Sequence, residues 1–92
     1  MALLRCETSK GPREGFTGVG VPSADGFKEH LTIEDKFLVH RHGSTYLAVA
    51  VVGRDLKRNR ALVQLPYEAD SGANRVWVRS DQVEYEEDEV PA

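Results

Sequence analysis

Two histidines, His40 and His42, have a spacing that suits metal binding. In an extended strand, side chains two residues apart project from the same face, so both imidazoles would point the same way. Zinc and copper sites use such nitrogen ligands, and His30 or an acidic residue could supply a third. The only cysteine, Cys6, lies far from them in the sequence. We therefore expect the histidines to face solvent, with neither a metal nor another cofactor bound.

No residue pattern typical of an enzyme is present in the sequence. It has no Ser–His–acid or Cys–His arrangement that its periodicity supports, no glycine motif that would hold a phosphate, and no pair of carboxylates in an apolar setting. Cys6 belongs to a mainly apolar run at residues 2–6, which predicts a small buried side chain and not a reactive thiol. The sequence thus predicts no catalytic residue.

A basic cluster occupies the middle of the chain. Its members are Arg54, Lys57, Arg58 and Arg60. Four cations on one loop could contact phosphates, and Trp77 or Tyr46 could stack on bases. The formal net charge of the chain is -3, however, and acidic residues crowd its C-terminus. These charges favour a solvated hairpin loop as the explanation of the cluster, and nucleic-acid binding is kept as an alternative function.

The sequence Val76-Trp77-Val78 places an aromatic side chain between two valines. If the valines face the core, Trp77 must face outward between two arginines. An outward tryptophan is commoner at an interface than on a free surface, although the N-terminal segment could instead cover it. Either case predicts that Trp77 is at least half buried. The expected partner-binding residues are Tyr46, Tyr67, Trp77 and Arg79.

The elements that position these residues are predicted to be β-strands. Apolar residues at helical spacing are never sustained over the roughly 11 residues that indicate an amphipathic helix. Short runs rich in Val, Tyr, Phe and Thr alternate instead with turn residues, which is typical of an all-β protein. A chain of 92 residues with 40% hydrophobic and 29% charged residues has the size and composition of one globular domain.

Seven strands are expected from these runs. They cover residues 3–8, 16–21, 37–41, 46–52, 61–65, 75–79 and 83–85. Residues 10–15 form the first turn, 42–45 another, 53–60 a polar loop, 68–74 a second loop and 80–82 a single tight turn. The 46–52 run is apolar on both faces, which suits a strand that bends sharply in a small barrel.

The order of elements from residue 33 to residue 85 resembles the Tudor and Agenet branch of the SH3-like barrels. The matching segments are 33–36, 45–49, 57–65 and 76–83. The resemblance implies an all-β fold, a small antiparallel SH3-like barrel over residues 32–85. Residues 1–31 would form an N-terminal β extension or arm, and residues 86–92 an acidic, disordered tail.

Tudor domains that bind methylated lysine or arginine hold the cation within an aromatic cage. By position, Tyr46 matches one wall of that cage, and Tyr67 is a candidate for another. Arg41 and Leu65 stand where two further aromatic residues would be expected. The resemblance therefore implies the architecture of the family and only part of its cage.

One family of SH3-like barrels, the plasmid-type dihydrofolate reductases, forms its active site in a pore between four identical subunits. Residues 63–67 (VQLPY) resemble the Val-Gln-Ile-Tyr motif of these enzymes. In strand order, however, that motif falls at residues 76–79, where glutamine and tyrosine are both absent. We do not expect this activity.

Together these patterns predict a non-catalytic binding module that uses an aromatic surface for protein or peptide interaction or for self-association into a homo-oligomer. Two alternatives are a nucleic-acid-binding barrel that uses residues 54–60 and a small-molecule enzyme formed at an oligomer interface. No apolar stretch reaches the roughly 18 residues of a membrane span, and the N-terminus lacks the apolar region of a signal peptide. We therefore expect a cytoplasmic protein without a membrane partner.

Overall fold

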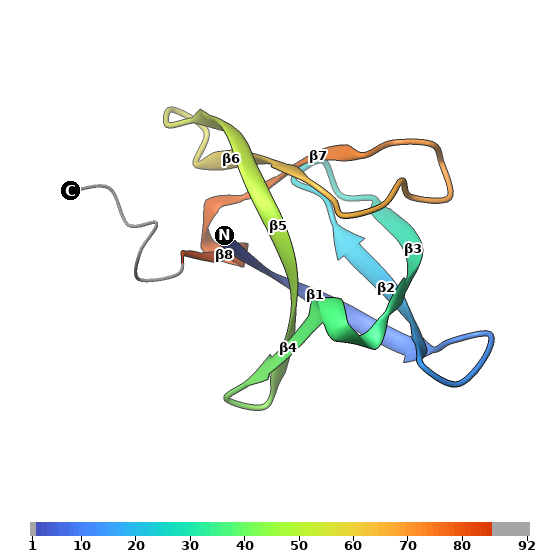
Figure 1. The fold of residues 1–92 in the computed structure, drawn as a ribbon. Helices are drawn as coiled ribbons and strands as arrows, with labels where there is room; N and C mark the ends of the chain where they lie inside the picture. Colours follow the sequence, from blue (N-terminus) through green and yellow to red (C-terminus); the bar gives the residue numbers. More distant parts are fainter. Residues whose placement is uncertain (1, 86–92) are drawn as a thin grey trace.

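The computed structural model describes residues 2–85, which form one antiparallel sheet of eight strands with two short 3-10 helices (Figure 1). The strands are β1 (Ala2–Lys10), β2 (Phe16–Pro22), β3 (Lys28–Glu34), β4 (Leu38–Arg41), β5 (Ser44–Asp55), β6 (Arg60–Gln64), β7 (Arg75–Arg79) and β8 (Val83–Tyr85). The 3-10 helices are η1 (Asp35–Phe37) and η2 (Ser80–Gln82). The expected acidic tail, residues 86–92, lies outside the described residues.

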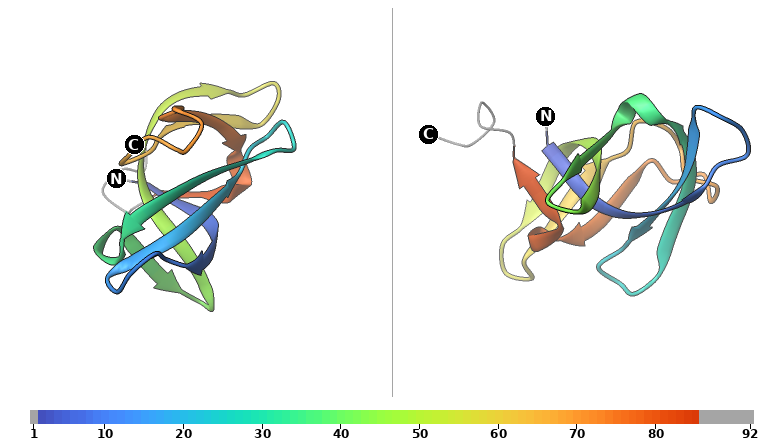
Figure 2. Two further views of the ribbon diagram at one scale, coloured as in Figure 1. Left: turned by 90° about the vertical axis from the view of Figure 1, so that its right-hand side faces the viewer. Right: turned by 90° about the horizontal axis from the view of Figure 1, so that it is seen from below.

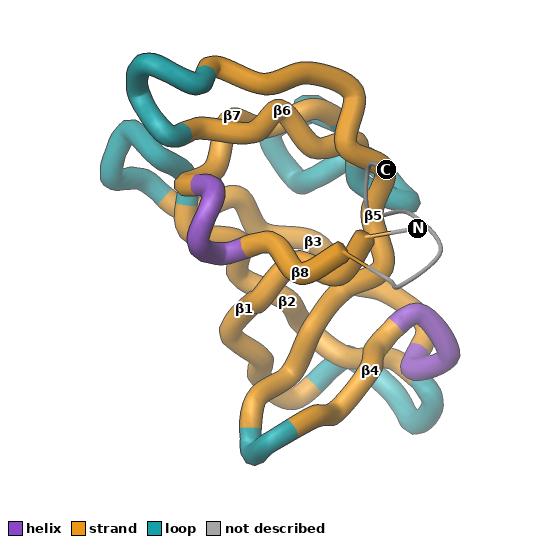
Figure 3. The backbone as a smooth tube through the Cα atoms, turned by 90° about the vertical axis from the view of Figure 1, so that its left-hand side faces the viewer, coloured by secondary structure: helices purple, strands orange, loops and turns teal. Residues whose placement is uncertain are grey.

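The sheet curls because two long strands, β1 and β5, each have different neighbours along their length. Residues 2–4 of β1 lie between β5 and β8, whereas residues 7–10 pair with β2. The first part of β5 pairs with β1 and β4, and its second part pairs with β6. The strand order is therefore β3-β2-β1-β5-β6-β7, and the sheet forms a half-barrel (Figures 2 and 3).

Backbone hydrogen bonds from two loops join the distant edges of the curled sheet. The N–H of Ala24, in the β2–β3 turn, donates to the carbonyl of Trp77 on β7 at 2.8 Å. The N–H of Asp70, in the β6–β7 loop, donates to the carbonyl of His30 on β3 at 2.7 Å. These contacts satisfy edge groups that would otherwise face solvent or an aggregating partner.

The core lies on the concave side of the sheet and draws on every part of the chain. Leu4 of β1 is paired with Leu47 of β5, and both side chains are fully buried. Val63 and Val78 close the core from β6 and β7. Complete burial of each such side chain contributes about 1.5–3 kcal/mol, which is the main stabilising term for a sheet of this size.

The all-β, antiparallel character predicted from the sequence is confirmed, and β7, η2 and β8 lie at the predicted residues. The prediction missed β3, although Leu31 and Ile33 alternate there with polar residues and are buried. The prediction of a polar loop over residues 53–60 was wrong for residues 53–55. β5 continues to Asp55, because residues 53–55 pair with β6 and leave only four residues in the turn.

The segment expected to be an N-terminal extension contributes to the same sheet and the same core as the rest of the chain. It supplies β1, β2 and the first half of β3, and β3 itself runs across residues 31 and 32. Leu4, Val19 and Val21 from this segment are buried with residues of β5 and β6. No helix of the described residues is long and apolar enough to cross a membrane.

Candidate functional site

The outer face of β6 and β7 presents an aromatic side chain surrounded by arginines. The pairing places Leu62 opposite Trp77 and Arg60 opposite Arg79, so these side chains share one face. Val76 and Val78 point into the core, as the alternation predicts, and Trp77 is 37% exposed. We call this surface the tryptophan face. Its residues are Arg60, Leu62, Gln64, Arg75, Trp77 and Arg79.

Trp77 is held in place by neighbours on both sides. Leu62 lies beside Trp77 on β6, and the backbone carbonyl of Trp77 accepts a hydrogen bond from the N–H of Ala24. Gly53 of β5 is paired with Leu62 and carries no side chain to cover it. The centre of the tryptophan face is therefore apolar and fixed on rigid strands, which lowers the entropy cost of binding a partner.

Each arginine at the edge of this centre is oriented by a polar neighbour. Arg60 forms an ion pair with Asp25 at 3.0 Å, and Arg79 forms one with Asp81 at 3.2 Å. Nε of Arg75 donates a hydrogen bond to the side-chain oxygen of Gln64 at 3.2 Å. Exposed ion pairs of this kind add little stability, but they place charges of both signs around Trp77.

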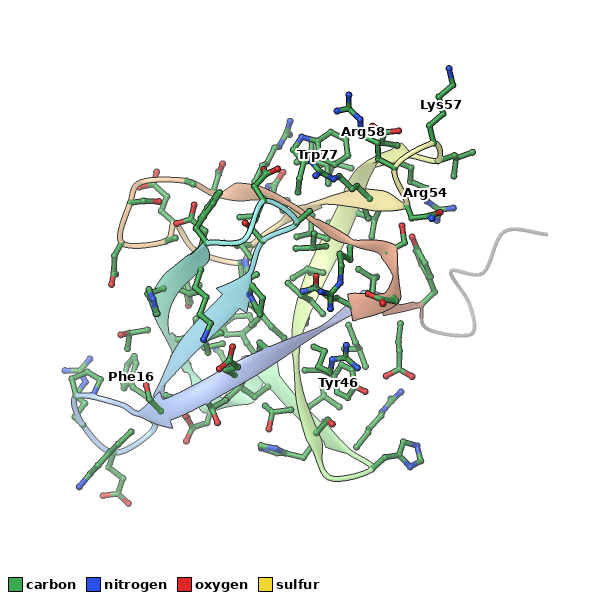
Figure 4. The ribbon with its side chains drawn as sticks, turned by 180° about the vertical axis from the view of Figure 1, so that it is seen from behind. Phe16, Tyr46, Arg54, Lys57, Arg58 and Trp77 are labelled. Carbon is green, nitrogen blue, oxygen red and sulfur yellow. The ribbon has the colours of Figure 1, made fainter. Side chains whose placement is uncertain are left out.

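The basic cluster predicted from the sequence is divided between two faces. Arg54 points to the concave side, where its guanidinium lies 4.7 Å from the centre of the Tyr85 ring. Arg60 belongs to the tryptophan face, and Arg58 lies 3.9 Å from Asp55. Lys57 lies in the β5–β6 turn and has no ion pair within residues 2–85. Figure 4 shows Lys57 and Arg58 at the same end of the molecule as Trp77.

Tyr46 lies far from Trp77, towards the other end of the molecule (Figure 4). It is paired with Arg5 of β1, and only 9% of it is exposed. A hydrogen bond to the carboxylate of Glu84 on β8 raises the pKa of Tyr46, and burial adds to this shift. Leu3 of β1, which is paired with Glu84, is fully buried.

Tyr67 lies at a third place, beside an apolar groove. Its ring meets Phe37 edge to face at a centroid distance of 5.5 Å, and its hydroxyl donates to Glu34 at 3.2 Å. The groove has a volume of about 490 Å³, and Leu65 and Pro66 form part of its wall. Burial and the Glu34 carboxylate raise the pKa of Tyr67. Sequence reasoning missed this groove, because its walls come from three separate segments, at residues 37, 48–51 and 64–66.

Of the four partner-binding residues expected from the sequence, the fold brings together Trp77 and Arg79 on one surface. Tyr46 and Tyr67 stand in separate environments, so the two walls expected for an aromatic cage do not face each other. The tryptophan face therefore combines the largest exposed aromatic side chain with neighbouring cations, and it is the candidate functional site.

His40 and His42 do not share one strand face as predicted, because β4 ends at Arg41. His42 lies in the turn with φ 52°, a left-handed conformation. Nδ1 of His40 lies 3.0 Å from the hydroxyl of Thr45. Among residues 2–85 there is no group of three or more His, Cys, Asp or Glu side chains placed to hold a metal ion.

Cys6 is partly buried on β1, where its thiol lies 3.7 Å from the carbonyl of Thr45. Burial, with a smaller contribution from Glu7, raises the pKa of the Cys6 thiol from 9.0 to about 11. Only the thiolate is nucleophilic, so this environment suppresses the reactivity of Cys6.

We expect Cys6 to react with a disulfide reagent at pH 8 roughly 100-fold more slowly in the folded protein than in urea, since the pKa is raised by about two units. Because the folded state retains the proton, stability should fall as pH rises from about 9 to about 11. Kinetics of thiol modification and urea titrations at several pH values measure both effects. A Cys6→Ala variant is the control, and equal rates in folded and unfolded protein would contradict the assignment.

No family model matches this chain, and neither the curated proteins nor the solved structures include a match. The function must therefore be inferred from the chemistry of the tryptophan face.

Proposed function

We propose that this protein is a non-catalytic interaction module that binds a protein partner through the tryptophan face of an SH3-like barrel. The observation that carries the proposal is Trp77, which is 37% exposed between Arg75 and Arg79 on a rigid strand. Tryptophan, tyrosine and arginine are the residues most enriched among the energetic hot spots of protein interfaces. An apolar centre surrounded by polar groups is the usual anatomy of such a contact.

The SH3-like assignment is supported by the arrangement of the strands. A long strand, β5, curves through the sheet and pairs in turn with β1 and β6. The single turn of η2 then separates β7 from β8, and β8 returns to pair with the first strand. This arrangement extends the barrel beyond residues 33–85 to include β1, and it leaves the outer face of β6 and β7 open for binding.

The charges around Trp77 favour a protein partner over a nucleic acid. Asp25 and Asp81 are paired with two arginines of the tryptophan face, and Asp55 lies near Arg58. These carboxylates would repel the phosphates of a nucleic acid while the cations attract them, so the net attraction is weakened. A protein surface can present both signs of charge and match them.

Peptides selected from a random displayed library against the wild-type protein should bind Trp77→Ala more weakly by about 1–3 kcal/mol, or roughly 5- to 150-fold in Kd. Tyr67→Ala is the matched control, because Tyr67 is an aromatic residue of similar exposure (42%) at another site. Fluorescence anisotropy with labelled peptides measures both variants.

Peptides that lose affinity for Tyr67→Ala and not for Trp77→Ala would contradict the proposal and assign binding to the Phe37 groove. A single-stranded oligonucleotide tested in the same assay provides a second comparison. Tight binding that weakens steeply with salt and is lost when Lys57 and Arg58 are replaced by alanine would identify a nucleic-acid-binding protein instead.

A further inference from the structure

We propose that the partner of the tryptophan face is a second copy of this chain. In this symmetric dimer, Trp77 of each copy enters a hollow beside Arg79 of the other. Because it uses the same surface, the dimer rests on the proposed function and names the partner for it. The shape, the cation placement and the charge pattern of the face each support this pairing.

The first support is that the surface carries both a projection and a recess. A hollow of about 470 Å³ lies at the end of β7, lined by Arg58, Asn59, Arg79, Ser80 and Asp81. Trp77 lies two residues before Arg79 on the same strand and projects from the same face, so projection and hollow are about 6.6 Å apart. A two-fold axis between them would place each tryptophan over the hollow of the partner, as a self-complementary interface requires.

The second support is the chemistry that the hollow offers to an indole. Cations already lie over Phe16, Phe37 and Tyr85, but among residues 2–85 no cation lies over the ring of Trp77. Arg58 and Arg79 line the hollow and would supply that contact to a partner's indole. The carboxylate of Asp81 could accept the hydrogen bond of the indole N–H, which needs a partner once buried.

The third support is that carboxylates as well as guanidinium groups lie around Trp77. Arg79 and Asp81 form an ion pair at 3.2 Å beside the hollow, and Arg60 and Asp25 form another at 3.0 Å. When two such surfaces are related by a two-fold axis, arginines of one copy can face aspartates of the other. A partner surface that carries charges of one sign only would leave either the arginines or the aspartates unmatched.

Light scattering combined with size exclusion, at about 1 µM to 1 mM protein, measures the dimer directly. The wild-type protein and Tyr67→Ala should dimerise, whereas Trp77→Ala should dimerise at least about tenfold more weakly with an unchanged circular dichroism spectrum. A wild-type protein that remains monomeric at the highest concentration would overturn the proposal, and so would dimerisation that is indifferent to Trp77.

A charge-swap experiment tests the geometry with two exposed side chains, Arg79 at 62% and Asp81 at 73% exposure. Arg79→Glu alone would place acids against acids across the axis, and Asp81→Lys alone would place cations against cations. Each variant should dimerise more weakly than the wild type, and an equimolar mixture of the two should regain association as a heterodimer. No regain in the mixture would overturn the proposed pairing.

Failure of the dimer can be separated from failure of the proposed function. If the wild type is monomeric and library peptides still depend on Trp77, the face binds another protein and the dimer alone is wrong. If neither self-association nor peptide binding depends on Trp77, both proposals are wrong.

Discussion

A chain reduced to residues 32–85 is expected to be unfolded, although the sequence pattern places a complete barrel within it. The truncation removes β1, which lies between β5 and β8 and pairs with both. It also removes five large apolar side chains that are fully or almost fully buried, those of Leu3, Leu4, Val19, Val21 and Leu31. At about 1.5–3 kcal/mol each, their loss approaches or exceeds the roughly 5–14 kcal/mol that stabilises a chain of this length.

Circular dichroism, amide NMR spectra and thermal melting measure this outcome. The matched control is a chain of residues 1–85, which keeps every strand of the described sheet and should retain a cooperative melting transition. A dispersed NMR spectrum and cooperative melting of residues 32–85 would contradict the prediction. That result would mean that β4 to β8 form an independent barrel and that β1, β2 and β3 only pack against it.

Gln82→Leu should reduce the free energy of unfolding by about 2–5 kcal/mol, because it leaves two backbone groups without partners. Gln82 is only 3% exposed. Its side-chain oxygen accepts a hydrogen bond from the N–H of Arg79 at 2.9 Å, and its side-chain nitrogen donates to the carbonyl of Pro22 at 2.9 Å. One side chain thus joins η2 to the end of β2 and fixes the chain immediately after the tryptophan face.

Urea unfolding of Gln82→Leu and of a surface control distinguishes the loss of these two hydrogen bonds from the general effect of replacing a glutamine by leucine. Gln64→Leu is the control, because Gln64 accepts a hydrogen bond from Arg75 on the outer face. This substitution should reduce the free energy of unfolding by less than about 1 kcal/mol. In a domain of this size, the expected loss for Gln82→Leu corresponds to a decrease in Tm of roughly 10–30 °C. Equal effects of the two substitutions would refute the proposed role of Gln82.

These two predictions concern how the functional surface is built. Gln82 holds the C-terminal end of β7, and the Ala24 N–H holds Trp77 from the β2–β3 turn. Residues from the first third of the chain therefore support a surface that belongs to β6 and β7. Substitutions in β2 or its turn could weaken binding without touching the partner, because they would loosen the strand that carries Trp77.

Much of the sheet could be predicted from the sequence where side-chain alternation is strong. In β7 the sequence RVWVR has valines alternating with large polar or aromatic residues, so only one orientation buries the valines. The outward direction of Trp77 followed directly from this alternation. β3 was missed because Leu31 and Ile33 are its only apolar residues, although they obey the same rule.

Alternation alone could not assign the residues of the basic cluster to faces. The pairing of β5 with β6 shifts between Val51 and Gly53, and one inserted residue exchanges the two faces of a strand. Gly53 therefore points outward beside Leu62, and Arg54 points inward to Tyr85. The sequence contains no local signal that places this irregularity, because its position depends on how both ends of β5 pack.

The candidate site shows the same division between local and long-range information. Local periodicity in the sequence determined that Trp77 faces outward between Arg75 and Arg79, and that the chain forms strands and no amphipathic helix. Only the tertiary structure decided that Tyr46 is covered beside Glu84, that Tyr67 adjoins Phe37, and that β1 crosses the centre of the sheet. The reason is physical: a strand's own sequence sets which side chains share a face, whereas its neighbours are chosen by contacts among segments far apart in the chain.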